Sequence, residues 1–331
     1  MDQRPSPTGS SGAIATAAAA PTSPYPAASP HDGAPAMGAP PGQFAPSPFK
    51  TLVIRSEYLL QSVLKYPLAA PCPHCDSARQ TLIARKYGVS RIVRCADCGL
   101  GFSRPIYRSW VADNFYDALY TAGFSTTLPD DARLADWLAT GFRDTQREAD
   151  AILQTLRRHA PTPSPALLEI GCSWGYFLQQ ARGAGFDVTG VEIGDQRRAF
   201  GRRRLGLDIV RSLGELPKDK RYDVVYTSHV LEHFTDLRGV FQRIATVLKH
   251  AGVLFVEVPN FDPRRFGSRC LSIVGAVHPL GFDSEFFRVN LPRHGLDVTG
   301  VFSSWDDVPD RPVAASQSDV LIIRAARLPA A

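Results

Sequence analysis

Two acidic residues and a glycine-containing turn form the part of the sequence whose residue types best suit cofactor binding. The run Leu167–Leu178 reads LLEIGCSWGYFL, so an apolar stretch ends in Glu169 and in the turn from Gly171 to Gly175. A second acid, Glu192, ends the next apolar stretch. Carboxylates accept hydrogen bonds from ribose hydroxyls, and a turn before a helix offers unpaired backbone N–H groups to a polar or anionic ligand. The pattern therefore indicates a site for a ribose-containing cofactor.

Four cysteines form a second chemically distinctive pattern. They make two Cys-x-x-Cys pairs, Cys72 with Cys75 and Cys95 with Cys98, at the separation typical of a zinc ribbon. A tetrahedral site of four thiolates is closed and therefore structural. Two disulfides or a redox pair are the alternatives, but we find neither a secretory signal nor a flanking thioredoxin-like βαβ pattern. We therefore predict a structural Zn²⁺, for which His74, inside the first pair, is not needed.

Two arginine clusters contribute to the formal net charge of +5. The cluster at 197–204 is predicted to form the solvated face of a helix. Arg264 and Arg265 lie in a loop after a strand end, where α/β enzymes bind substrates, and their guanidinium groups could hold a phosphate or carboxylate of an anionic substrate. Neither cluster interleaves aromatic residues as a nucleic-acid platform does, so we expect no nucleic-acid partner.

The elements that position these residues alternate along the chain. Apolar runs predict strands at 166–170, 186–191, 207–210, 222–228, 252–258, 296–302 and 319–324. Helical spacing predicts helices at 175–184, 195–205, 236–249 and 283–294, with a loop insertion at 259–282. The last two strands have no helical pattern between them, which indicates a hairpin-like antiparallel end. The alternation predicts an α/β, doubly wound, mostly parallel sheet.

These motifs together resemble those of class I S-adenosylmethionine (SAM)-dependent methyltransferases. The resemblance rests on four segments in order, which are Glu169–Gly175, Val191–Glu192, Tyr222–His233 and Leu248–Asn260. It implies a Rossmann-like sheet of seven strands with an antiparallel seventh strand, SAM as cofactor, and methyl transfer as the activity. Ser173 stands where the commonest family pattern has glycine. Because serine is small and tolerates turn conformations, we expect the turn to remain intact.

The resemblance also implies roles around the cofactor. The turn would face the methionine end of SAM through the backbone of Gly171, Cys172, Ser173 and Gly175. Glu169 would stabilise this turn or the cofactor's amino group, and Glu192 would bind the ribose hydroxyls. Glu215, after the third strand, is placed like the family's adenine-side acid.

On the acceptor side, Ser228 and His229 end the fourth strand at the cofactor's reactive end, and Glu232 and His233 open the next segment. We take His229, Glu232 and His233 as catalytic candidates. His233 is the candidate general base because neutral imidazole near pH 7 can take a proton. The alternative is that His233 only packs or caps. His278 would line the acceptor pocket or bond its own loop.

The rest of the chain predicts separate segments. Residues 1–48 are rich in Ala and Pro and cannot bury a core, so we expect a disordered tail, within which Met37 is an alternative start. A zinc-ribbon module at 66–106, a helical linker at 107–162 and a methyltransferase domain at 163–328 follow. The linker reads as one long or broken helix over 129–160. The ribbon resembles that of sugar-nucleotide C-methyltransferases, which usually continue into a further C-terminal domain.

The sequence therefore predicts a cytoplasmic SAM-dependent methyltransferase that acts on a small-molecule acceptor and has no membrane partner. A sugar nucleotide, or an intermediate of polysaccharide or secondary-metabolite synthesis, is the expected acceptor class. A non-catalytic SAM- or ligand-binding protein on the same fold remains an alternative. An NAD(P)-dependent oxidoreductase is less favoured because Tyr176 occupies the position of the third glycine. A serine hydrolase is disfavoured because its Gly-x-Ser-x-Gly turn normally follows several strands, whereas here the sheet begins at this strand.

Overall fold

A computed structural model describes most of the chain beyond the N-terminal region. The described residues are 56, 60, 63–64, 70–86, 90–106, 127–234, 236–267, 272–275, 278–306, 308, 312–313, 316 and 318–327. The predicted tail at 1–48 and the first part of the predicted linker, 107–126, lie outside them. Among the described residues, no helix combines the length and apolar character needed to cross a membrane.

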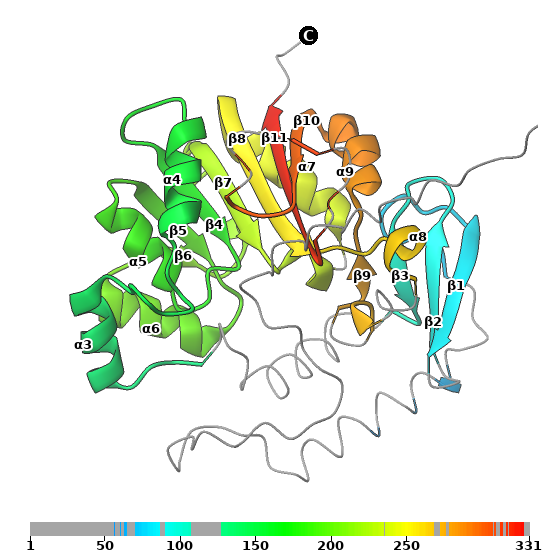
Figure 1. Cartoon of the computed structure of the whole chain (residues 1–331), viewed down its shortest axis with the longest axis horizontal. Helices are drawn as coiled ribbons and strands as arrows, with labels where there is room; N and C mark the ends of the chain where they lie inside the picture. The colour runs from blue at the N-terminus through cyan, green and yellow to red at the C-terminus, as the bar shows by residue number, and fades with distance from the viewer. Residues whose placement is uncertain are drawn as a thin grey trace, which may run out of the picture. The chain divides into compact units, whose positions relative to one another are not determined.

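In the described part of the chain, seven strands form one sheet in the order β10-β11-β8-β7-β4-β5-β6 (Figure 1). The strands are β4 (Ala166–Ile170), β5 (Asp187–Val191), β6 (Ile209–Val210), β7 (Tyr222–Ser228), β8 (Leu248–Pro259), β10 (Leu296–Phe302) and β11 (Val320–Arg327). The pairs from β6 to β8 are parallel, and β11 runs antiparallel to both β8 and β10. The predicted doubly wound sheet and its antiparallel end are confirmed.

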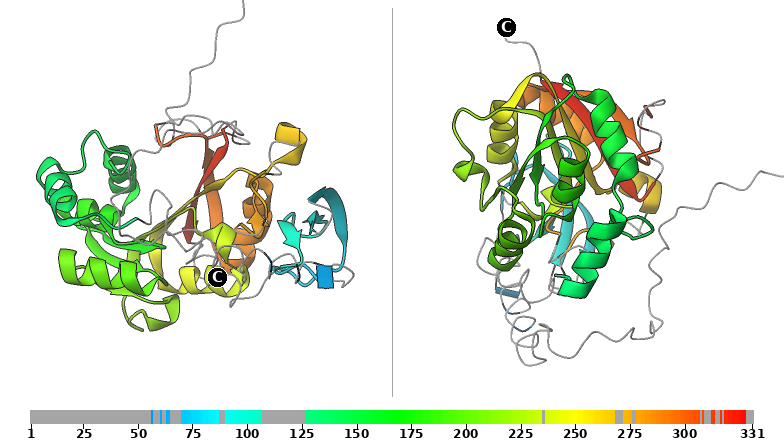
Figure 2. Two further views of the ribbon diagram at one scale, coloured as in Figure 1. Left: turned by 90° about the horizontal axis from the view of Figure 1, so that it is seen from below. Right: turned by 90° about the vertical axis from the view of Figure 1, so that its left-hand side faces the viewer.

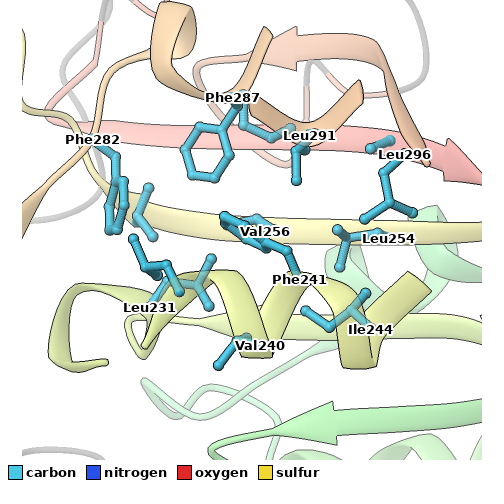
Figure 3. Close-up of a cluster of buried hydrophobic side chains, with 14 of the residues drawn as sticks. Leu231, Val240, Phe241, Ile244, Leu254, Val256, Phe282, Phe287, Leu291 and Leu296 are labelled. Carbon is cyan, nitrogen blue, oxygen red and sulfur yellow. The ribbon is translucent and has the colours of Figure 1, made fainter. Parts of the chain in front are cut away.

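Helices cover both faces of this sheet, which is why β4 is buried along its whole length. Side chains of α4 (Asp150–His159), α5 (Tyr176–Gly183) and α6 (Asp195–Leu205) pack into one buried cluster. Side chains of α7 (Leu237–Val247) and α9 (Ser284–Asn290) pack into another. Figure 3 shows the second cluster, with residues of α7 facing the sheet and the segment after α9. Its labelled members are Leu231, Val240, Phe241, Ile244, Leu254, Val256, Phe282, Phe287, Leu291 and Leu296.

Two predicted helices are interrupted, each at a residue with a clear backbone reason. The segment at 129–160 forms α3 (Asp131–Thr140) and then α4. Gly141 ends α3 in the left-handed conformation, and its N–H donates to the carbonyl of Trp137. The segment at 283–294 forms α9 and then the 3₁₀ helix η4 (Leu291–His294), which has a proline in its first turn.

A smaller antiparallel sheet is formed by β1 (Gln80–Lys86), β2 (Ser90–Cys95) and β3 (Gly101–Arg104). Of the four cysteines, Cys95 ends β2, Cys72 and Cys75 precede β1, and Cys98 lies between β2 and β3. The loop insertion after β8 contains α8 (Pro263–Phe266) and β9 (Leu280–Gly281). The short strand β9 lies beside β3 in Figure 1 and pairs with it, which completes the ribbon sheet. The left-hand view of Figure 2 shows the cyan strands of this sheet to one side of the larger sheet. The ribbon sheet is therefore built from two parts of the chain that are far apart in sequence.

Polar contacts join the ribbon to the larger sheet's helices. Arg94 of β2 pairs with the buried Asp283 at 2.6 Å between Nη2 and Oδ2. The side-chain amide of Asn290 in α9 donates to the carbonyl of Cys98 at 2.8 Å. Because Asp283 also caps α9, by accepting from the backbone N–H of Phe286, the ribbon and α9 are fixed against one another.

Candidate functional site

The turn after β4 has the backbone conformation that its small residues permit. Gly171, Ser173 and Gly175 all have positive φ, at 81°, 51° and 88°. A Cβ at Gly171 would lie 2.2 Å from Cγ2 of Val230, so the turn approaches the end of β7 more closely than any other residue allows. Ser173 adopts the left-handed conformation at the position where glycine is usual, as expected for a small turn residue.

The backbone N–H groups of this turn are not left open to a ligand. Gly171 and Cys172 donate to the carbonyl of Val191 at 2.8 and 3.0 Å. The N–H of Ser173 donates to Oε2 of Glu192 at 3.0 Å. The prediction of unpaired amides in the turn is therefore wrong for these three residues. The turn folds back onto the end of β5, which satisfies its buried backbone groups.

Glu192, at the end of β5, is a buried acid with several protein partners. Its Oε1 accepts from the N–H of Gly194 at 2.7 Å and from Nε of Arg197 at 3.1 Å. Arg197 is only 6% exposed, so its assignment to a solvated helix face is wrong, whereas Arg202–Arg204 are exposed as predicted. Each carboxylate oxygen can accept two hydrogen bonds, so Oε2, which accepts one from the N–H of Ser173, retains capacity for a ligand hydroxyl.

Glu169, near the end of β4, has a buried carboxyl with one oxygen that lacks a polar partner among the described residues. It is 6% exposed, and its Oε2 has no hydrogen-bond partner among the described residues. Burial, and after it the charge of Glu192, raises the pKa of Glu169 to about 8. A cationic ligand group would supply the partner that this carboxyl lacks. The acids and the tight turn therefore fit a cofactor that carries both an ammonium group and a ribose.

The remaining predicted cofactor residues occupy different environments. Ser228 ends β7 and donates from its hydroxyl to Glu257 Oε2 at 2.8 Å. Glu257 of β8 lies directly beside it in the parallel pairing and also accepts from the hydroxyl of Tyr226. We did not predict this strand-end carboxylate, although its place at the end of an apolar run was the available signal. Glu215, in the 3₁₀ helix η1 (Leu213–Glu215), is exposed and accepts from the N–H of Arg211.

Histidines and one acid gather beyond the end of β7, in a group that we call the Glu232 cluster, namely His229, Glu232, His233 and His278. Glu232 and His233 belong to the 3₁₀ helix η2 (Leu231–His233), whereas His278 comes from the insertion just before β9. The rings of His233 and His278 are 4.7 Å apart between centroids. Nδ1 of His229 lies 3.5 Å from Oε1 of Glu232. The structure thus brings the three catalytic candidates and one predicted substrate residue together.

The charges of this cluster are mutually dependent. Glu232 is 1% exposed, and although burial by itself raises its pKa, the neighbouring His229 lowers it overall. Partial desolvation lowers the pKa of His229, but Glu232 raises it more, so its pKa lies above the usual value. Burial lowers the pKa of His278 to about 4. The cluster therefore combines an ionised carboxylate with a neutral imidazole near pH 7, as proton transfer requires.

The two predicted substrate arginines lie on exposed parts of α8. Arg264 pairs with Asp262 at 3.0 Å and with Asp283 at 3.4 Å, so its guanidinium already has acidic partners. Arg265 is exposed, and its N–H donates to the carbonyl of Asp262. Their role toward a substrate remains a prediction.

The four ribbon cysteines form a compact group of thiols. Their sulfur atoms all lie within 4.8 Å of one another, and the pairs Cys72–Cys98 and Cys75–Cys95 are each 3.5 Å apart. All four carry free thiols rather than disulfides. With Zn–S bonds of about 2.3 Å, a tetrahedral ion needs sulfurs at close to these separations. The donor set therefore fits a structural Zn²⁺.

Comparison with known proteins agrees with this arrangement. Residues 142–298 match the family profile described as a methyltransferase domain. A ubiquinone biosynthesis O-methyltransferase of Acinetobacter baumannii (strain ACICU) is 26% identical over 123 residues, and the match covers 34% of this chain and 51% of that protein. The enzyme of the same name from Bradyrhizobium sp. (strain ORS 278) is 30% identical over 120 residues, and the match covers 34% of this chain and 46% of that protein. The chain spans about half the length of these curated relatives.

Solved structures similar to this chain are also methyltransferases. One from Clostridium acetobutylicum covers 60% of this chain and 98% of its own, with 11% identity and a TM-score of 0.44. A glycopeptide N-methyltransferase complexed with sinefungin covers 55% of this chain and 94% of its own, with 15% identity and a TM-score of 0.42. The strand order, the strand-end acids and the family profile at 142–298 agree. The segment at 142–298 is therefore similar to a methyltransferase domain.

Proposed function

We propose that this protein transfers a methyl group from SAM to a small-molecule acceptor. The observation that carries the proposal is the buried pair of acids at adjacent strand ends. Glu169 has an oxygen without a partner among the described residues, and Glu192 lies beside it at the turn. Bound SAM would supply an electrophilic methyl group on its sulfonium, together with an ammonium group for Glu169 and ribose hydroxyls for Glu192.

Different residues of the chain would bind different parts of SAM. The turn from Gly171 to Gly175 would hold the methionine end through close approach of its backbone, with Ser228 at the end of β7 nearby. Glu215, in its exposed turn, is proposed to lie on the adenine side. Positioning of this kind supplies much of the rate, because methyl transfer is an in-line displacement.

On the acceptor side, we assign the proton transfer to His233. Its ring lies beside that of His278, next to the buried Glu232, so the cluster can orient an imidazole and stabilise its protonated form. His229 and Glu232 would tune this proton transfer, while His278 would form a wall of the acceptor pocket. Arg264 would contact an anionic acceptor only if its acidic partners Asp262 and Asp283 were displaced, and Arg265 would contact the acceptor from the same short helix α8.

We also assign a structural Zn²⁺ to Cys72, Cys75, Cys95 and Cys98, because the sulfur separations fit a tetrahedral ion. The segments at 66–106, 107–162 and 163–328 are proposed as ribbon, linker and methyltransferase domain. A sugar nucleotide, or an intermediate of polysaccharide or secondary-metabolite synthesis, is the proposed acceptor. The names of the similar proteins include both O- and N-methyltransferases and so do not select one acceptor atom.

A direct test incubates the zinc-loaded protein with SAM and a panel of nucleotide sugars, phenols and amines. Mass spectrometry should find one acceptor that gains the mass of one methylene group. The Glu192→Gln variant is the matched control and should form this product more slowly at limiting SAM. SAM binding without turnover on every acceptor would instead favour a non-catalytic SAM-binding protein.

A further inference from the structure

The Glu232 cluster contains more ligand atoms than a single proton transfer requires. Glu232, His233 and His278 each place one ligand atom within 4.8 Å of the other two. Both carboxylate oxygens of Glu232 are buried without a hydrogen-bond partner among the described residues, although Oε1 lies 3.5 Å from Nδ1 of His229. A buried carboxylate costs free energy unless it is paired or coordinates a metal.

We propose that Glu232, His233 and His278 bind one divalent transition-metal ion, at a site separate from the four cysteines. Two imidazoles and one carboxylate form a donor set that Zn²⁺, Co²⁺ and Fe²⁺ accept. Three protein ligands leave a coordination position open, which distinguishes this site from the closed four-cysteine site.

Neighbouring groups could orient two of the proposed ligands, as the hydrogen-bond partners of metal ligands do in metalloproteins. The His278 ring makes a hydrogen bond with the backbone of Ile273, which fixes the ring's orientation. His229 stands on the far side of the carboxylate and would hold Glu232 in place as an outer partner. The ligands come from two chain segments, η2 and the stretch before β9, so the ion would also tie the insertion to the end of β7.

Occupation of this site has a consequence for His233. A metal ion and a proton use the same nitrogen lone pair, so the loaded protein cannot use His233 as its base. The ion could instead bind an acceptor oxygen and lower its pKa. This consequence rests on the proposed function, whereas the binding of the ion does not.

The test uses full-length protein whose cysteine site is loaded with zinc and which has been dialysed to remove weakly held ions. Co²⁺ is then titrated by calorimetry and visible absorption. One Co²⁺ per chain should bind beyond the zinc, with ligand-field bands but without the charge-transfer band of cobalt–thiolate bonds. Glu232→Gln and His278→Ala should each weaken Co²⁺ binding by more than the roughly 10–100-fold that loss of an outer partner costs. His250→Ala, which removes an exposed histidine of β8, should leave it unchanged.

Absence of Co²⁺ binding beyond the zinc overturns the proposal, and so does binding that persists in both variants. Thermal unfolding and zinc content of each variant establish that it is folded, and the two variants remove different ligands. SAM is titrated in parallel. Co²⁺ binding without SAM binding contradicts the proposed function alone, while SAM binding without Co²⁺ binding contradicts the metal site alone.

Discussion

Glu169 is a buried carboxyl whose ionisation should change when a cation binds beside it. With a pKa of about 8 it holds a proton at pH 7 in the free protein. A neighbouring ammonium group favours the ionised form, so SAM binding should release about one proton per chain at pH 7 and almost none above pH 9. Calorimetry of SAM binding in buffers with different ionisation enthalpies measures this release. The Glu169→Gln control should release none, and a release that persists in it would contradict the assignment.

His233 is expected to act in catalysis rather than in cofactor binding. Loss of a general base typically slows a reaction by about 10²–10⁴-fold, so in protein without an ion at the Glu232 cluster His233→Ala should reduce turnover by that factor while SAM affinity stays nearly unchanged. Turnover, SAM affinity and melting temperature are measured on this variant and on His250→Ala. Near-normal turnover with an acceptor that the unmutated protein methylates would leave His233 with a packing role.

At the scale of the elements, β3 of the ribbon packs tightly against the insertion after β8. A Cβ at Gly101 in β3 would lie 2.3 Å from Cε1 of the buried Phe261. Gly101→Ala should therefore destabilise the fold by about 1–3 kcal/mol, because a packed core resists added volume. Gly183→Ala, at the end of α5 with nothing within 4 Å of its Cβ, is the matched control and should cost no stability. Chemical unfolding measures the free energy of unfolding of both variants. Equal stability of the two would contradict the tight packing at Gly101.

The zinc site should stabilise β9 as well as the ribbon itself. Because β9 pairs with β3, removal of zinc by a chelator should speed amide hydrogen exchange in β2, β3 and β9 but leave β4 and β5 protected. Elemental analysis before chelation, after dialysis that removes weakly held ions, should find one zinc per chain. Unchanged exchange in β9 on zinc removal would mean that the insertion folds without the ribbon.

Strong periodicity made the main elements predictable from sequence, whereas contacts between distant segments were not. The strands at 166–170 and 296–302 and the helix at 195–205 have the predicted bounds. Strand β9 has two residues, too few to show a period of two, and its partner lies far away in sequence. The burial of Arg197 depends on its pairing with Glu192, which helix spacing alone does not reveal.

The candidate site was predictable where residues sit at strand ends, since parallel strands present their carboxyl ends at one edge of the sheet. Glu169, Glu192 and Ser228 follow this rule. The approach of His278 to His233 depends instead on the path of the insertion, which carries no periodic signal. The closed hydrogen bonding of the turn likewise depends on the carbonyl of Val191 in the neighbouring strand.

At the scale of the whole molecule, the account requires one SAM bound per chain at the carboxyl ends of β4, β5 and β7. The family profile covers residues 142–298, so the ribbon and the rest of the chain lie outside the part that it describes. The zinc-loaded full chain is therefore the proper material for testing cofactor binding.

Calorimetric titration of this protein with SAM is the most direct test of that requirement. The account predicts saturable binding of one SAM per chain. It also predicts that Glu192→Gln, which keeps the size of the side chain beside Arg197, loses about 1–3 kcal/mol of binding free energy, or roughly 5- to 150-fold in affinity. Absence of binding heat across several temperatures in the folded, unmutated protein would contradict the account, as would an affinity that Glu192→Gln leaves unchanged.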